Sequence, residues 1–234
     1  MNISDQGIII SSKAFQETSA IVTVFTRENG IQSGIANNIK SPKNAHIYLA
    51  GNFVDFAWNA RLATHMGSVK CELIKAYGAK VMHNKLRLYA MNSILSLIQA
   101  TLKPLEKYTD LFDVLHQYAA KDDFSFLDYI KTELFLLQEI GYSLDLSACA
   151  STGTAENLTY VSPKSGKAVS NEAGKPYEGM MLKLPAFLRL NIDESCHIQI
   201  SDAMNLTGYF FKRHVFMSNK DPVAREMFRE AVCG

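Results

Sequence analysis

Apolar and polar residues alternate along much of the first eighty residues. Between Val54 and Leu62 every even-numbered residue is apolar, whereas Asp55 and Arg61 lie on the odd-numbered face. A period of two is typical of a strand with one buried face. We therefore expect Trp58, an even-numbered residue, to belong to a hydrophobic core.

Four further apolar runs complete a β-rich region. They cover residues 7–10, 20–28, 31–36 and 69–73. Asn29-Gly30 separates the second run from the third and is a strong hairpin signal, since both turn positions favour positive φ. A turn at residues 65–67 precedes the last run. Five short strands, with a longer connection after the third, predict a small Greek-key barrel such as an OB-fold in residues 1–80.

The apolar period changes to three and four residues after residue 84, as in amphipathic helices. The first helical stretch ends at Lys103-Pro104, because proline cannot continue a helix. A shorter helix is marked by residues 111–118. We expect these helices to open a helical domain over residues 81–234, so that the fold class is α+β.

The third helix has the clearest pattern in this domain. Its apolar stripe runs from Leu127 to Ile140, and Gly141 supplies the usual C-terminal glycine. Helical periodicity returns at 204–216. Asp221-Pro222 indicates the cap and first turn of a last helix.

Residues 146–177 interrupt the helical pattern with glycine, proline, serine and asparagine. The runs "LTYVS" and "KAVS" predict a short hairpin on an irregular loop. The outline resembles a zinc ribbon, but a tetrahedral zinc site needs four ligands, commonly two C-x2-C pairs. Cys149 stands alone, with Thr152 at the partner position and neither Cys nor His from 150 to 177. We therefore expect no metal and no other cofactor, and we expect Cys149 to be a small buried thiol.

Composition and charge narrow the class of protein. Hydrophobic residues make up 47% of the 234 residues and charged residues 20%, which is ordinary for a folded domain. The formal net charge of +1 is divided unevenly, at +3 up to residue 80, −4 over 81–160 and +2 beyond. The four cysteines are scattered, as free thiols in a reducing compartment are. No apolar run reaches the ~18 residues of a membrane span, so we expect a cytoplasmic protein without membrane contact.

Motifs of catalysis are missing from the sequence. The six histidines never form H-E-x2-H, and no G-x-S-x-G elbow appears. Lys167 and Lys175 follow glycines but are followed by Ala168 and Pro176, so neither belongs to a phosphate-binding loop. We expect a protein that is not an enzyme.

Basic residues on the predicted barrel are the best candidates for a binding site. OB barrels bind single strands with a positive groove for phosphates and aromatic side chains for bases. The candidate DNA-binding residues are Lys13, Phe15, Arg27, Lys40, Lys43 and Arg61. If these do not bind, the second candidate site is the basic group Lys164, Lys167, Lys212 and Arg213.

Several blocks of the sequence, in this order, resemble the bacterial recombination mediator family RecO in its alphaproteobacterial form. They are "ETSAIVTVFTRENG", "GNFVDFAWNARLATHMG", "ELFLLQEIGYSLDLSACASTG", "LTYVSPKSGKAVSNEAGKPY", "LPAF" and "LTGYFFKRHV". The resemblance implies an N-terminal OB-fold, a helical domain and a zinc-finger-like hairpin insertion. Many members carry four cysteines in that insertion, whereas this chain keeps one.

The resemblance also implies a function in DNA repair and homologous recombination. A mediator of this family binds single- and double-stranded DNA, anneals complementary strands and associates with RecR. It also engages the C-terminal tail of single-strand binding protein and so helps to load RecA onto coated DNA. The alternative is a protein-interaction adaptor whose barrel binds protein rather than DNA.

Overall fold

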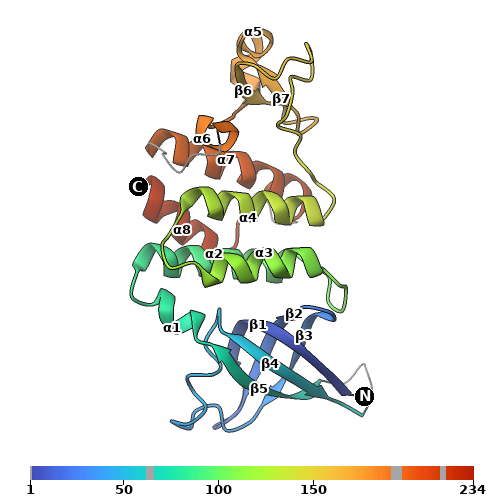
Figure 1. The fold of residues 1–234 in the computed structure, drawn as a ribbon, viewed down its shortest axis with the longest axis vertical. Helices are drawn as coiled ribbons and strands as arrows, with labels where there is room; N and C mark the ends of the chain where they lie inside the picture. The colour runs from blue at the N-terminus through green and yellow to red at the C-terminus, as the bar shows by residue number, and fades with distance from the viewer. Residues whose placement is uncertain (1, 62–65, 191–196, 217–219) are drawn as a thin grey trace. The chain divides into compact units, whose positions relative to one another are not determined.

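The computed structural model describes residues 2–61, 66–190, 197–216 and 220–234. By compactness the chain divides into two units, Met1–Asp122 and Asp123–Gly234, which are described separately below (Figure 1). The predicted turn at residues 65–67 lies partly outside the described residues. The predicted domain boundary at residue 80 stays a prediction, since the first compact unit contains helices as well as strands.

Five strands of the first unit form a closed barrel in the order β1-β2-β3-β5-β4. They are β1 (Asn2–Ala14), β2 (Ala20–Thr26), β3 (Gly30–Ala36), β4 (Phe53–Asn59) and β5 (Gly67–Lys75). The pairs are antiparallel except for a short parallel contact between β3 and β5. The prediction of five strands is confirmed, although β1 is much longer than its apolar run at 7–10.

The predicted hairpin of β2 and β3 is confirmed, but its turn covers residues 27–29, and of the two predicted turn residues only Gly30, the first residue of β3, has a positive φ. Gly30 has φ +67°, a conformation that costs glycine little. A side chain would also collide there, because an added Cβ would lie 2.0 Å from the backbone oxygen of Glu106. Glycine is therefore required at this position by both the turn and the packing.

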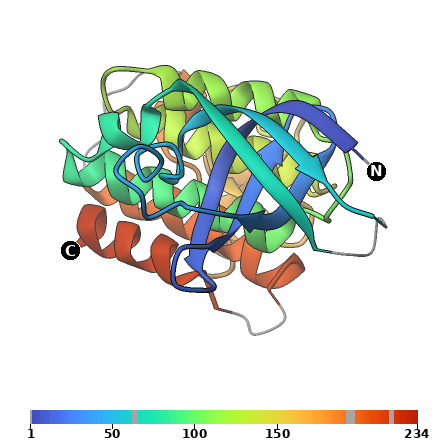
Figure 2. The ribbon, with the colours of Figure 1, turned by 90° about the horizontal axis from the view of Figure 1, so that it is seen from below.

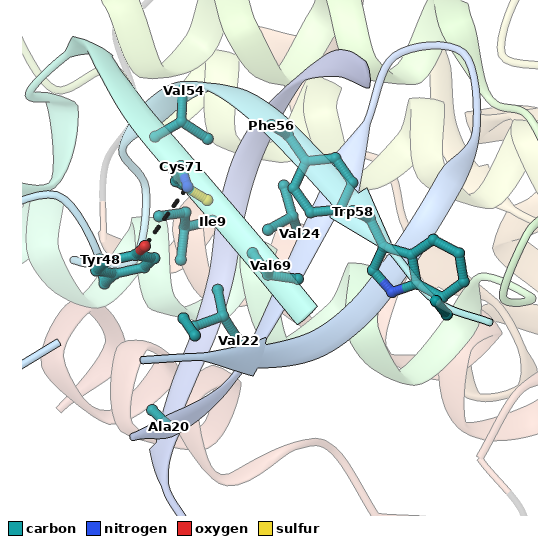
Figure 3. Close-up of a cluster of buried hydrophobic side chains, with 12 residues drawn as sticks. Ile9, Ala20, Val22, Val24, Tyr48, Val54, Phe56, Trp58, Val69 and Cys71 are labelled. Atoms are coloured by element: carbon teal, nitrogen blue, oxygen red, sulfur yellow. Dashed lines mark hydrogen bonds between the residues drawn. The ribbon is translucent and has the colours of Figure 1, made fainter. Parts of the chain in front are cut away.

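The barrel is filled by apolar side chains from the inward faces of its strands (Figure 3). Trp58 is 5% exposed and lies in this core, as its even-numbered position predicts. The indole Nε1 donates to the backbone oxygen of Ser33 at 3.1 Å, so burial leaves the indole N–H satisfied. The other core residues include Ile9, Val22, Val24, Tyr48, Val54, Phe56, Val69 and Cys71.

Three helices complete the first unit: α1 (Tyr77–Val81), α2 (Lys85–Thr101) and α3 (Thr109–Ala120). α2 begins where the Asn84 side chain accepts from the backbone N–H of Arg87 at 3.1 Å, an N-cap bond. It ends before Lys103-Pro104, and α3 covers residues 111–118, so both predicted helices are confirmed. α3 contacts the barrel through rings, with Phe112 against Phe25 at 5.6 Å between centroids.

The second unit contains three long helices: α4 (Phe126–Glu139), α7 (His197–His214) and α8 (Val223–Cys233). α4 ends as predicted at a glycine of positive φ, Gly141 at +89°. The prediction that Asp221 caps α8 is wrong. Pro222 is the N-cap residue and makes no side-chain cap bond, while the Asp221 carboxylate turns to Arg225 at 2.7 Å.

Arg225 is fully buried and joins the three helices. Its Nε and Nη2 donate to the two carboxylate oxygens of Glu133 at 2.8 and 3.0 Å. Glu133 also accepts from Tyr129 and Thr207, both at 2.5 Å. Burial alone would lower the pKa of the Arg225 guanidinium, but Glu133 outweighs that effect and raises it. The guanidinium is thus held charged inside the unit.

The predicted insertion folds into a small sheet with short helices around it. The elements are β6 (Leu158–Val161), β7 (Ala168–Ser170), α5 (Asn171–Gly174), η1 (Lys175–Met180), β8 (Leu182–Lys183) and α6 (Ala186–Leu190). The hairpin of β6 and β7 is confirmed. β8, which pairs with the other side of β6 as the third strand, lies beyond the predicted end of the insertion at 177.

None of the helices that the structure describes is long and apolar enough to cross a membrane.

Removing the buried guanidinium is expected to destabilise the second unit strongly. Arg225→Met leaves Glu133 buried without its cation, which costs about 3–5 kcal/mol of unfolding free energy. Arg225→Met combined with Glu133→Leu should recover most of that loss, because no unpaired charge then remains at position 133 and Asp221, which also loses Arg225, keeps Lys212 at 3.4 Å as its cation. Urea unfolding measures both free energies.

Arg229→Met is the matched control on the same helix, since Arg229 pairs with Glu226 at 2.7 Å but is 41% exposed. We expect a loss of about 0–1 kcal/mol there. Equal losses for the Arg225 and Arg229 variants would contradict the role given to burial.

Candidate nucleic-acid interface

A cavity of about 650 Å³ opens on the barrel. We call it the barrel cavity. Four segments line it: the start of β1, the connection between β3 and β4, the end of β4 and the start of β5. Its lining residues are Asn2, Ile3, Ser4, Asn37, Asn38, Asn44, Ile47, Tyr48, Ala57, Trp58, Asn59, Ser68, Val69, Lys70 and Cys71.

The connection between β3 and β4 lines one side of this cavity, and the side chain of Asn52 holds it in place. The buried Asn52 amide donates to the backbone oxygens of His46 and Ile47 at 2.8 and 2.9 Å. Its carbonyl oxygen accepts from the backbone N–H of Gly78 at 2.9 Å. One buried side chain thus ties the connection to α1. Figure 2, the view from below, looks onto this connection and β5.

Lys40 and Lys43 project from the same connection. Both are exposed, and neither forms an ion pair with a described residue. Asn38, two residues before Lys40, and Asn44, directly after Lys43, line the cavity. The connection therefore carries two free positive charges next to the cavity mouth.

Lys13 lies near the end of β1, and Phe15 follows in the turn between β1 and β2, which is hydrogen-bonded to the connection. The backbone N–H of Ile39 donates to the oxygen of Thr18 at 3.0 Å, and Ser19 donates to the Asn37 side chain at 2.8 Å. Phe15 is 48% exposed, so it lies outside the core. Lys13 is exposed as well.

Arg61 is exposed and follows the lining residue Asn59 by two positions. β4 ends at Asn59, so Arg61 lies just beyond the strand that lines the cavity. None of the six candidates is among the described lining residues: Lys13, Phe15, Lys40, Lys43 and Arg61 lie on or next to lining segments or on a turn bonded to one, and the backbone N–H of Arg27 donates to Gln6 of β1 at 3.0 Å.

Arg27 is placed differently, against α3 at the β2–β3 turn. Its Nε and Nη2 donate to the Asp113 carboxylate at 3.0 and 2.8 Å, and its Nη1 lies 3.2 Å from Glu28. The hydrogen bond from Arg27 lowers the pKa of Asp113. Arg27 therefore anchors the turn to α3, and its charge is offset by two carboxylates.

Sequence reasoning missed Lys70 and the asparagines of the cavity. Lys70 lines the cavity but pairs with Glu72 at 2.8 Å on the same face of β5. The hydrogen bond to Glu72 raises the pKa of Lys70. The asparagines come from separate segments, so no local pattern in the sequence predicts that they line one cavity.

The insertion does not carry the donors of a zinc site. Cys149 is buried, and its Sγ accepts from the backbone N–H of Ser170 at 3.2 Å and lies 3.5 Å from the Ser170 hydroxyl. Thr152 and Ser170 supply hydroxyls where a zinc site needs thiolate or imidazole. Among the described residues, no three His, Cys, Asp or Glu side chains gather in a way that could hold a metal. The residues present do not fit zinc.

The environment of Cys149 favours its thiolate instead. Burial raises the pKa of this thiol, but hydrogen bonds from Ser170 and Thr152 outweigh burial and lower it to about 6. Cys71, by contrast, lies in the barrel core, where burial raises its pKa to about 12.

Comparison with known proteins identifies the family. The family model described as "Recombination protein O N terminal" matches residues 1–77, and the model described as "Recombination protein O C terminal" matches residues 82–221. The chain belongs to the RecO family. It is therefore a member of a family of DNA repair and recombination proteins.

Curated relatives agree over nearly the whole chain. A "DNA repair protein RecO" of Rickettsia bellii (strain OSU 85-389) is 44% identical over 234 residues, which cover 99% of this chain and 97% of the relative. A "DNA repair protein RecO" of Rickettsia akari (strain Hartford) is 46% identical over 230 residues, 97% of each chain. The RecO resemblance expected from the sequence blocks is confirmed.

The Cys149 thiolate should make stability depend on pH. Its pKa of about 6 in the folded state lies below the ~8.5 of an unfolded cysteine. The stabilisation is therefore complete above pH 8.5 and is lost as the pH falls through 6. The difference in unfolding free energy between the parent chain and Cys149→Ala should grow from pH 5.5 to pH 8, measured in urea.

Cys71→Ala is the control, because the Cys71 thiol, with a pKa of about 12, stays protonated in the folded state, and an unfolded cysteine with a pKa of ~8.5 is still mostly protonated at pH 8. Its stability difference should therefore change by only about 0.2 kcal/mol over this range. A Cys149→Ala difference that is equally constant would show that the thiolate does not form.

Proposed function

We propose that this RecO-family chain is a recombination mediator without catalytic activity, acting in the cytoplasm. Its barrel, of OB type, binds single- and double-stranded DNA and anneals complementary strands. Together with RecR it helps to load RecA onto strands coated by single-strand binding protein. The observation that supports the DNA-binding part is that Lys13, Lys40, Lys43 and Arg61 lie on or next to the barrel segments that line one cavity or are hydrogen-bonded to a lining segment.

Electrostatics supports phosphate binding at this place. The ammonium groups of Lys40 and Lys43 are free of carboxylate partners among the described residues, so they can exchange counterions for phosphates. Phe15 adds an exposed ring on which a base can stack. Such contacts read no sequence, which suits a protein that must act on any damaged strand.

A hollow in the second unit supports a separate site for a protein partner. It measures about 320 Å³ and is lined by residues of α4 and of the segment after it. Leu134, Phe135 and Leu144 are half-buried there, and the exposed Lys131 lies at its edge. Apolar walls beside a cation suit an apolar peptide that ends in a carboxylate. We place the C-terminal tail of single-strand binding protein there.

Charge reversal on the connection should weaken DNA binding. Lys40→Glu with Lys43→Glu removes two phosphate contacts, so the slope of log K against log salt for a single strand should fall by about 1.4 in magnitude. Fluorescence anisotropy of a labelled strand, titrated at several salt concentrations, gives both affinity and slope.

Lys85→Glu with Lys103→Glu is the matched control, since both lysines are exposed in the same unit and the change in net charge is identical. Its salt slope should equal that of the parent chain. An unchanged slope in the Lys40/Lys43 variant would move the DNA site elsewhere, to Lys164, Lys167, Lys212 and Arg213 in the first instance.

A test of the peptide site distinguishes the proposed mediator from the alternative, an adaptor whose barrel binds protein. Phe135→Asp places a charge in the apolar hollow and should reduce binding of the tail peptide at least ten-fold, while DNA affinity stays unchanged. Tyr177→Asp, at a ring of the same unit that is 53% exposed and outside the hollow, is the control. If the tail peptide instead displaced DNA from the parent chain, the barrel itself would bind protein, as the adaptor alternative requires.

A further inference from the structure

The barrel cavity is rich in amides and poor in charge. Five asparagines line it: Asn2, Asn37, Asn38, Asn44 and Asn59. Among its described lining residues Lys70 is the only charged one, and Glu72 pairs with it at 2.8 Å. The cations that we assign to phosphates lie on or next to the segments that line this cavity and are not among its lining residues, whereas the lining itself is nearly neutral. A phosphate would find no free positive charge inside.

Two aromatic rings form part of its walls, and their polar atoms are already engaged. The Trp58 indole donates to Ser33, and the Tyr48 hydroxyl accepts from the backbone N–H of Cys71 at 3.4 Å. Figure 3 shows the two rings at opposite ends of the core cluster, with Val69 also among the lining residues. Both rings are thus fixed in place, and since Trp58 is 5% and Tyr48 8% exposed, each presents only a small apolar edge to the cavity.

The amides lie where an occupant's polar edge could meet them. Asn2 and Asn59 are exposed cross-strand partners on β1 and β4, so their amides stand side by side at the outer rim of the cavity, on the face of β4 opposite the inward ring of Trp58. An amide donates through its nitrogen and accepts through its oxygen. Neighbouring amides can consequently satisfy the mixed donors and acceptors of a base edge, whichever base it is.

Volume and chemistry together select the occupant. About 650 Å³ lies within the ~300–1,000 Å³ of small-molecule sites. Apolar walls with neutral amides suit a flat, uncharged molecule that has both donors and acceptors. We propose that the barrel cavity receives a nucleobase turned out of a bound single strand, while Lys40 and Lys43 contact its phosphates. The inference rests on the proposed DNA-binding function and adds the group that the cavity recognises.

Trp58 supplies a direct probe, because it is the one tryptophan of the chain and lines the cavity. The experiment titrates the full chain with an oligothymidylate and with a strand of equal length made of abasic nucleotides. Both strands carry the same phosphates. Base-bearing DNA should quench the Trp58 fluorescence, bind about ten-fold more tightly than the abasic strand and leave the latter without quenching. Free thymidine at millimolar concentration should quench as well.

Blocking the cavity tests its location. Ser4→Leu adds bulk at a lining residue of β1, whereas Ser12→Leu adds the same bulk at an exposed residue of β1 outside the cavity. Ser4→Leu should lower the affinity for oligothymidylate to that for the abasic strand and leave abasic binding unchanged. Ser12→Leu should behave as the parent chain.

Each failure has its own signature. Equal quenching by the two strands, or tight DNA binding without any quenching, overturns the base pocket and leaves the proposed function standing. A parent chain that binds neither strand at low salt overturns the proposed function and the pocket with it. Equal effects of Ser4→Leu and Ser12→Leu overturn the assignment of the base to this cavity.

Discussion

Closure of the barrel depends on one long strand, β1, that pairs with two neighbouring strands. β1 pairs with β4 through its first half and with β2 through its second, and Gly7 is paired on both sides, opposite Val54 and Thr26. A Cβ at Gly7 would lie 2.4 Å from Val24 Cγ1, so a side chain cannot be accommodated where the three strands meet. Because the start of β1 lines the cavity and its end carries Lys13, this shared strand sets the geometry of the candidate interface.

The second unit is held by a different kind of interaction. Arg225 and Glu133 are fully buried and satisfied by each other and by Tyr129, Thr207 and Asp221. Such a network adds little stability over good apolar packing, but it penalises any arrangement that separates its members. It therefore specifies how α4, α7 and α8 meet. In the insertion, hydrogen bonds between Ser170 and Cys149 and pairing of β8 with β6 hold the sheet together.

Local periodicity accounts for what the sequence predicts well. The strands, the helices α2, α3 and α4 and the core position of Trp58 follow from patterns within a few residues. Local patterns do not reveal partners that are distant in sequence. Arg27 and Asp113, which form an ion pair, are 86 residues apart. Asp221 has the local signature of a cap, but the buried guanidinium of Arg225 is a stronger partner than backbone N–H groups. The asparagines of the cavity meet only through the register of the closed barrel.

A nearly neutral cavity with cations on the neighbouring segments would separate two parts of recognition. Both single strands and duplexes offer phosphates, so under the proposed function Lys40 and Lys43 would give affinity for either. A base is available to the cavity only where it is unpaired and unstacked, which is cheapest in a single strand. The cavity therefore adds affinity for single strands alone. Since an inserted base must leave before it can pair, the proposed annealing of complementary strands requires that the added affinity stay moderate.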